Sequence, residues 1–250
     1  MRVLVLGAGP SGLVAAHAAT QLGHQVTILS KKREPSLQYG CQYLHAPIPG
    51  YEDVPSVRVS YNLNGTPEQY RQKVYGDAWQ GKVSPEDFVG EHQAWDIRET
   101  YQLMWEPYRS VVEEYEVVDG NLQFARFLYE PDAIISTIPA TSLCEREYHT
   151  FDRHKIWAAG SNQETTAENS IVCDGTTDMD WYRIANVFGS RTVEWPINVH
   201  AGSVAVRVTK PLKTDCDCHP EVIRAGRYGE WDKSVLVHQV FSKVTEALNA

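Results

Sequence analysis

RVLVLGAGPSG, residues 2–12, decides the fold of this chain. Its apolar first half is typical of a buried parallel strand, and the alanine-rich residues 13–22 that follow favour a helix. Three glycines between them form the pattern G-x-G-x-x-G. Residues 25–29 (QVTIL) indicate a second strand, so the opening segment predicts a βαβ unit that binds a dinucleotide.

Each position of this loop has a physical task. Gly7 permits the tight turn, Gly9 lets a pyrophosphate approach the backbone, and Gly12 lets the helix pack close to the strand. Pro10 and Ser11 lie in the turn before the helix, whose first N–H groups have no partner within the helix and would face the anion. We therefore predict these five residues as cofactor ligands.

The acidic residue that usually binds the ribose is absent. The second strand ends at Ser30, where Asp or Glu would be usual, and Lys31 and Lys32 follow. A serine with two lysines could hold the 2′-phosphate of NADP. A serine hydroxyl can equally bind a ribose hydroxyl of FAD, and paired lysines are often only solvated. Taken alone, residues 30–32 favour FAD and NADP nearly equally.

The composition is that of an ordinary globular protein. The chain has 250 residues, 42% of them hydrophobic, which suffices for one sizeable core or two small ones. Its net charge of -9 argues against bulk nucleic-acid binding, which needs a basic face. No apolar run approaches the ~20 residues that span a bilayer, and no secretory signal is visible. With five scattered cysteines, we expect a reduced cytoplasmic protein without membrane association.

Further along, residues 31–84 indicate long loops and short strands with no clear period, and local patterns predict a helix over 85–115 with Ser84 as its N-cap. They predict a hairpin over 116–124 turned by Asp119-Gly120-Asn121 and a final helix over 233–248 capped by Asp232. The remaining apolar runs indicate a buried strand at 133–138 and antiparallel strands at 156–159, 170–173, 181–187, 192–194 and 203–209.

Three later stretches carry a family resemblance. YGCQYLH, residues 39–45, matches the segment Y-G-x-H-x-F-H at Tyr39, Gly40 and His45, with Gln42 in place of the first histidine. DAIISTIP, which ends at Ile138 and Pro139, matches D-x-V-I-x-T-x-P. The third stretch matches G-R-x-G-x-[YW] and consists of Gly226, Arg227, Tyr228, Gly229, Glu230 and Trp231.

With the glycine loop, these stretches resemble a shortened member of the flavoprotein group that includes UDP-galactopyranose mutases and amine oxidase-like enzymes. The resemblance implies that residues 39–45 lie against the flavin. It also implies that residues 226–231 bring a second helix N-terminus to the pyrophosphate. The resemblance favours FAD as the cofactor, with NADP as the alternative, and it does not identify the substrate.

The expected fold class is α/β, with a Rossmann-like FAD-binding parallel sheet assembled from both chain ends and an inserted substrate region that is β-rich, antiparallel and helical. The cofactor domain would comprise 1–45, 115–145 and 210–250. The substrate region would comprise 46–114 and 146–209. The two could also form one compact unit.

Two residues are candidates for the chemistry. The resemblance places His45 at the flavin, where an imidazole with a pKa near neutrality could carry a proton. Arg183 in Trp181-Tyr182-Arg183 could bind an anionic substrate by its planar fork, or could simply be paired on a sheet surface.

We expect an FAD-dependent oxidoreductase that acts on a small or nucleotide-linked substrate, with NAD(P)H as a possible electron donor. A non-redox flavoenzyme of the UDP-galactopyranose mutase type and a non-catalytic FAD- or NADP-binding protein are the alternatives. The sequence leaves the oligomeric state open.

Residues 215–219 (DCDCH) concentrate possible metal ligands. A tetrahedral site needs four converging ligands, usually from two separated pairs. Cys144 or Cys173 could complete such a site in space, which the sequence does not show. We therefore expect a loop there and assign no metal.

The first prediction concerns colour. We expect the purified protein to be yellow, or to shift the absorption bands of added FAD, because the loop and residues 226–231 together suit this cofactor. A colourless protein that ignores FAD but gains heat resistance from NADPH would contradict this, and would make Ser30, Lys31 and Lys32 ligands of a 2′-phosphate.

Overall fold

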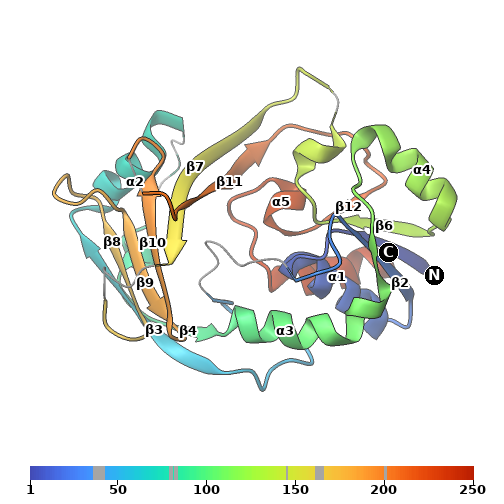
Figure 1. The fold of residues 1–250 in the computed structure, drawn as a ribbon, viewed down its shortest axis with the longest axis horizontal. Helices are drawn as coiled ribbons and strands as arrows, with labels where there is room; N and C mark the ends of the chain where they lie inside the picture. Colours follow the sequence, from blue (N-terminus) through green and yellow to red (C-terminus); the bar gives the residue numbers. More distant parts are fainter. Residues whose placement is uncertain (36–42, 79–80, 82–83, 145, 161–165, 200–201) are drawn as a thin grey trace.

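The structure is a computed structural model that describes residues 1–250 except 36–42, 79–80, 82–83, 145, 161–165 and 200–201. Two β-sheets lie at opposite ends of the long axis, joined by extended connections (Figure 1). Among the described residues, no helix has both the length and the apolar character needed to cross a bilayer.

The first sheet is entirely parallel and has the order β12-β6-β1-β2-β5. Its central strand comes from the N-terminal stretch, and its edge strand β12 comes from the C-terminal region. This confirms the predicted Rossmann-like sheet built from both chain ends. The strands are β1 (Arg2–Leu6), β2 (Gln25–Ser30), β5 (Val112–Glu114), β6 (Ala133–Ser136) and β12 (Ile223–Arg224).

Both faces of the parallel sheet are covered by helices. Val3 and Val5 of β1 belong to the core beneath three helices, whereas Leu4 and Leu6 belong to the core beneath one. This division follows from the alternation of side chains along a strand. The three helices are α1 (Pro10–Gln21), α3 (Ile97–Tyr108) and α6 (Gln239–Asn249), and α4 (Asp119–Tyr129) covers the other face.

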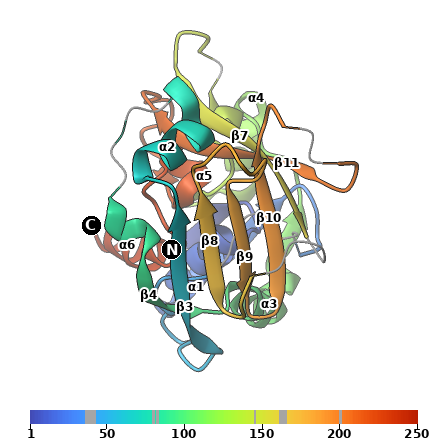
Figure 2. The ribbon, with the colours of Figure 1, turned by 90° about the vertical axis from the view of Figure 1, so that its left-hand side faces the viewer.

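The second sheet is mixed and has the order β11-β7-β10-β9-β8-β3-β4 (Figure 2). The expected antiparallel arrangement holds for every neighbouring pair except β3 and β8, which are parallel. Parallel neighbours need a long crossover, and here the chain visits the first sheet between them. The strands are β3 (Ser56–Asn64), β4 (Gly90–Trp95), β7 (Phe151–Gly160), β8 (Ser170–Asp174), β9 (Arg183–Val187), β10 (Ser190–Pro196) and β11 (Val206–Thr214).

The loop-rich prediction for 31–84 is wrong in its second half. That half contains the nine-residue strand β3 and helix α2 (Pro67–Tyr75), whose N-terminus has a capping box between Thr66 and Gln69. Val59 is buried and Leu63 packs against the same core, so the alternating pattern of a half-buried strand was present in the sequence.

The helix predicted over 85–115 is confirmed only over Ile97–Tyr108, where α3 lies, and is wrong on both sides of it. Ser84 does cap a helix, but that helix is the single 3-10 turn η2 (Pro85–Phe88), after which Gly90 takes a φ of 92° and β4 begins. Asp96 then caps α3 with its carboxylate, which accepts from the backbone N–H of Arg98. Residues 85–115 therefore contribute β4 to the second sheet and β5 to the parallel sheet.

The predicted hairpin at 116–124 is a helix, α4. Asp119-Gly120-Asn121 forms the first turn of that helix, and Asn121 Oδ1 accepts from the Val118 N–H at 2.9 Å. Leu122 and Ala125 lie one helical turn apart and are both buried against the sheet. Burial at i and i+3 requires a helix, which the turn residues alone did not indicate.

The last helix begins at Gln239 and not at 233. Asp232 accepts from the N–H of Ser234 at 2.7 Å and so caps a turn. Residues 226–231 are themselves helical in part, as the five-residue helix α5 (Gly226–Glu230).

The chain crosses between the sheets four times. It does so from β2 to β3, from β4 through α3 to β5, from β6 to β7, and from β11 to β12. Because β6 pairs with β12 and β7 pairs with β11, the last two crossings run side by side, in the upper part of Figure 1.

The helical state of α4 can be tested with two leucines. Leu122 is 0% exposed and Leu128 is 53% exposed. Leu122→Ala should lower the free energy of unfolding by about 2–5 kcal/mol, as for other buried leucines. Leu128→Ala, the matched control, should change it by no more than about 0.5 kcal/mol. Urea titration followed by tryptophan fluorescence measures both. Equal losses would contradict the helix.

Candidate functional site

The glycine loop is packed backbone against backbone. Gly7 takes a φ of 101°, which favours glycine, and a Cβ at Gly12 would lie 1.8 Å from the Gly7 carbonyl oxygen. A Cβ at Gly9 would instead meet no heavy atom within 4 Å. The fold itself therefore requires glycine at positions 7 and 12, whereas a side chain at position 9 would enter open space.

The start of α1 has unpaired N–H groups. Gly9 is its N-cap and offers no side chain, and Pro10 occupies the first helical position. The N–H groups of Ser11 and Gly12 consequently lack helical partners. The loop is held from α3, where the buried Tyr101 hydroxyl donates to the Ala8 carbonyl at 2.8 Å.

The C-terminal element lies directly against this loop. Gly226 has a φ of 76°, and a Cβ there would lie 2.5 Å from Ser11 Oγ. A Cβ at Gly229 would lie 2.3 Å from the Ser136 carbonyl oxygen at the end of β6. Both glycines are thus needed for α5 to reach the ends of the parallel strands.

The other residues of this element divide into two groups. Arg227 lines the cleft described below, and no carboxylate in the described part of the chain forms an ion pair with it. Tyr228 also lines the cleft and donates to the Thr209 carbonyl at 2.6 Å. Glu230 pairs with Lys243 of α6 at 2.7 Å, and Trp231 is buried and donates to the Asp152 carbonyl at 2.8 Å. These last two residues connect α5 to α6 and β7.

A cleft of about 720 Å³ joins the loop to the mixed sheet. This is within the range of pockets that bind small ligands, roughly 300–1,000 Å³. Its walls carry arginines and lysines, and no Asp or Glu lines it among the described residues. The residues that matter for its chemistry are Gly9, Pro10, Ser11, Tyr43, His45, Arg183, Arg207, Lys210, Arg227, Tyr228, Lys233 and His238.

A buried charge network forms the floor of the cleft on the mixed sheet. Glu194 of β10, whose side chain is 1% exposed, pairs with Arg183 and with Lys210, the latter at 2.8 Å. Burial alone would raise the pKa of Glu194, but the two cations outweigh it and lower this pKa to about 2. Burial also lowers the pKa of Lys210 to about 8. Two cations against one carboxylate leave a positive floor.

His45 lies two residues after Tyr43, where the described chain resumes, and its side chain is exposed to the cleft. Its ring lies 4.7 Å from that of Tyr43 and 6.3 Å from that of His238. Burial, followed by the neighbouring imidazoles of His238 and His92 and the guanidinium of Arg227, lowers the pKa of His45 below its ordinary value. The imidazole is therefore neutral at neutral pH and can accept a proton.

The described structure does not place several predicted cofactor residues in the cleft. Tyr39, Gly40 and Gln42 are outside the described residues. Ser30 ends β2, and Lys31 beyond it pairs with Glu116 at 2.8 Å on an exposed surface.

The return strand contributes from behind the loop. A Cβ at Gly7 would lie 3.1 Å from Ile138 Cγ2, so Ile138 backs the loop. Pro139 precedes a 3-10 turn and is not among the described residues that line the cleft.

Sequence reasoning missed four residues that shape this site. Thr137 belongs to the matched motif, and its Oγ1 donates to the Leu6 carbonyl at 2.9 Å behind Gly7, so the motif could have indicated it. Tyr101, Lys210 and Glu194 carry no local signal, because their partners lie on other elements.

Comparisons with known proteins agree with this geometry. The NAD(P)-binding Rossmann-like domain family matches residues 5–54, which contain the glycine loop and β2. No curated protein matches the chain by sequence. The fold, in contrast, has many solved relatives.

The crystal structure of reduced UDP-galactopyranose mutase matches with a TM-score of 0.55 at 12% identity, over 99% of this chain and 94% of that one. A variant of HpxO from Klebsiella pneumoniae complexed with FAD matches with a TM-score of 0.54 at 12% identity, over 98% and 79%. The 2,6-dihydroxypyridine-3-hydroxylase of Arthrobacter nicotinovorans matches with a TM-score of 0.56 at 11% identity, over 99% and 82%.

The chain shares the fold of these three proteins. The resemblance stated from the four sequence motifs is confirmed at this level, in the parallel sheet and in the separate mixed sheet. At these identities the comparisons show the fold alone, and the ligand and reaction are argued below.

Gly9 provides a test of ligand contact that is separate from folding. Gly9→Val should abolish dinucleotide binding and leave the midpoint of thermal unfolding of the ligand-free protein within a few degrees, because the new side chain meets only open space. Gly12→Ala should instead destabilise the fold, since its Cβ overlaps the Gly7 carbonyl. Calorimetry and fluorescence titration measure the two effects. Parental affinity in Gly9→Val would make the loop a structural turn only.

Proposed function

We propose that the protein is an FAD-dependent oxidoreductase that acts on a small or nucleotide-linked anionic substrate. The observation that carries the proposal is the cleft of about 720 Å³, which runs from the unpaired helix start at Gly9–Ser11 to the positive floor at Arg183 and Lys210. One end suits a pyrophosphate and the other suits a substrate anion, so the space between them is the place for a redox cofactor.

The residues present fit FAD. The open space at Gly9 and the N–H groups of Ser11 and Gly12 suit the pyrophosphate. Arg227, which has no carboxylate partner among the described residues, would supply positive charge from the other wall. When bound, the flavin would accept and release the electrons, while the protein would orient it and exclude water.

The surroundings of Ser30 favour FAD over NADP. Lys31 is paired with Glu116, and Lys32 is paired with Glu34 at 3.4 Å. A 2′-phosphate placed there would meet two carboxylates as well as two lysines. The pairs are exposed and individually weak, but they do not form the cationic pocket that a 2′-phosphate needs. A ribose hydroxyl could still bond to Ser30.

The end of the cleft at the mixed sheet, where the substrate would bind, is lined by positively charged side chains. Glu194 holds Arg183 and Lys210 in place but balances only one of their charges. The exposed Arg207 adds a third cation to the same wall. Arg183 would therefore contribute to substrate binding as a positive charge held in place by its ion pair with Glu194. This wall of the cleft suits a phosphate or a carboxylate group of the substrate.

His45 is the group we assign to proton transfer. It lies in the cleft between the phosphate loop and the mixed sheet, and its lowered pKa keeps it neutral and basic at neutral pH. Tyr43 beside it hydrogen-bonds Tyr61 at 2.9 Å, and burial raises the pKa of both phenols. His45 is thus the better proton acceptor of this group.

The reaction class can be tested by anaerobic titration of the holoenzyme with NADH and with NADPH. The proposal expects bleaching of the flavin bands by one of them and their return on mixing with oxygen or an acceptor. Bound FAD that neither donor reduces, in a protein active only after dithionite treatment, would indicate a mutase-type enzyme. Absence of both FAD binding and turnover would indicate a non-catalytic protein.

The role of His45 has its own readout. His45→Gln should keep full flavin content but lower the rate of turnover at least about tenfold, as for the loss of a general acid–base group. In the parent, the rate should fall as the pH drops through the lowered pKa of His45, because protonation removes the acceptor, and the variant should lack this limb. His24→Gln, at the far end of α1, is the matched control. An unchanged rate in His45→Gln would make it a loop residue.

A further inference from the structure

Four side chains that can bind metal converge outside the cleft. Cys144, His149, Cys216 and Cys218 place their sulfur and nitrogen atoms within 4.8 Å of one another. Cys144 and His149 lie in the connection from β6 to β7, and the two other cysteines lie in the connection from β11 to β12. Residues more than 65 positions apart in the chain thus meet where the two crossings run side by side.

The three distances among Cys144, His149 and Cys218 are close to those of a tetrahedron around a small metal ion, and Cys216 Sγ lies within 4.8 Å of each of these ligand atoms. Cys144 Sγ lies 3.7 Å from Cys218 Sγ, and His149 Nδ1 lies 3.2 Å from Cys144 Sγ and 3.6 Å from Cys218 Sγ. With zinc–sulfur bonds of about 2.3 Å and zinc–nitrogen bonds of about 2.05 Å, a regular tetrahedron has edges of about 3.8 Å and about 3.5 Å. A disulfide would require sulfurs about 2.05 Å apart.

A second layer of contacts orients these ligands. His149 turns its other nitrogen, Nε2, to Asp217 Oδ1 at 3.3 Å, the usual arrangement of a metal-bound histidine. Arg224 lies 3.3 Å from Cys216 Sγ and donates to the carbonyls of Cys216 and Cys218 at 3.0 and 2.7 Å. Three thiolates and a neutral imidazole around Zn²⁺ carry one net negative charge, which the guanidinium of Arg224 balances.

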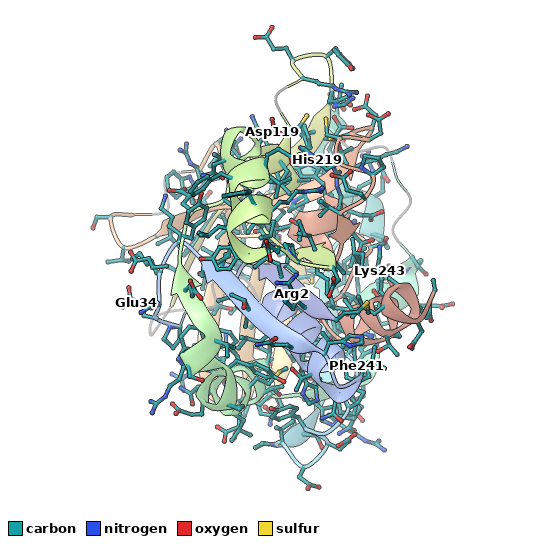
Figure 3. All side chains as sticks on the ribbon, turned by 90° about the vertical axis from the view of Figure 1, so that its right-hand side faces the viewer. Arg2, Glu34, Asp119, His219, Phe241 and Lys243 are labelled. Atoms are coloured by element: carbon teal, nitrogen blue, oxygen red, sulfur yellow. The ribbon has the colours of Figure 1, made fainter. Side chains whose placement is uncertain are left out.

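His219 has a different task from the one its place in residues 215–219 suggested. Its Nε2 hydrogen-bonds the Asp119 carboxylate at the start of α4, and Figure 3 shows the two side chains together. His219 therefore braces the loop against α4 and is not one of the four converging ligands. The fourth ligand is His149, which the sequence did not single out.

We infer that these four residues form a structural zinc site that ties the two inter-sheet crossings together. A thiolate-rich tetrahedral set favours zinc among the available divalent ions. Four protein ligands leave no position open for a substrate, and the side chain of His149 is only 6% exposed, so the site is structural. The inference does not depend on the proposed flavin chemistry, because none of the four residues lines the cleft.

Metal content tests the site directly. Protein freed of any affinity tag and purified without chelator should contain about one zinc per chain by inductively coupled plasma mass spectrometry. Cys216→Ser and Cys218→Ser should each lose most of it. Cys173→Ala is the matched control, since Cys173 is a buried thiol in β8 outside the cluster, and it should keep the metal.

A second measurement keeps the inference testable if the serine variants fail to fold. Replacement of the metal in the parent by Co²⁺ should give the intense thiolate charge-transfer and visible bands of tetrahedral cobalt. Chelation of the parent should lower the thermal midpoint and expose residues 144–150 and 214–219 to protease. Parent protein with less than about a tenth of a zinc per chain and no cobalt bands would overturn the inference. A mass two daltons low, showing a Cys144–Cys218 disulfide, would overturn it as well.

Discussion

Backbone packed on backbone, at the edge where the parallel strands end, is the constraint on which the rest of the structure depends. Helix α1 lies so close to β1 that Gly12 leaves no room for a methyl group against the Gly7 carbonyl. Helix α5 approaches the end of β6 equally closely at Gly229. Glycine is costly in a helix because of its freedom in the unfolded chain. That cost is offset here by an arrangement in which both helices converge on one small volume.

The cleft runs from that volume to the mixed sheet, and charge determines what it can hold. A carboxylate as buried as Glu194 is unfavourable unless it is well paired. Arg183 and Lys210 pair with it and hold its pKa low, while Glu194 keeps both cations in a fixed geometry beneath the cleft. The cations are therefore oriented before any ligand arrives, which lessens the reorganisation that an anion would otherwise impose.

The parts of the fold that could be predicted from the sequence are those with a local steric cause. The glycine loop, the buried strand β1 and the return strand β6 could be predicted because each is marked by a short pattern of consecutive residues. Asp119-Gly120-Asn121 shows the limit of this reasoning. The same three residues suit a tight turn or a helix start, and only the burial of Leu122 and Ala125 against a strand more than 100 residues away decides for the helix. The site divides in the same way: Gly9 was predictable, whereas Glu194 and His149 act through distant partners and have no periodic signal.

The order in which these elements are synthesised has a consequence for the life of the protein. Gly226, which closes against Ser11, and Val240 of α6, which covers α1, leave the ribosome more than 200 residues after the glycine loop. Until they emerge, α1 has an uncovered apolar flank and the loop has no second wall. The closed form of the loop can therefore assemble only after more than 200 further residues have been made. Closure of the glycine loop is, for this topology, a late event of folding.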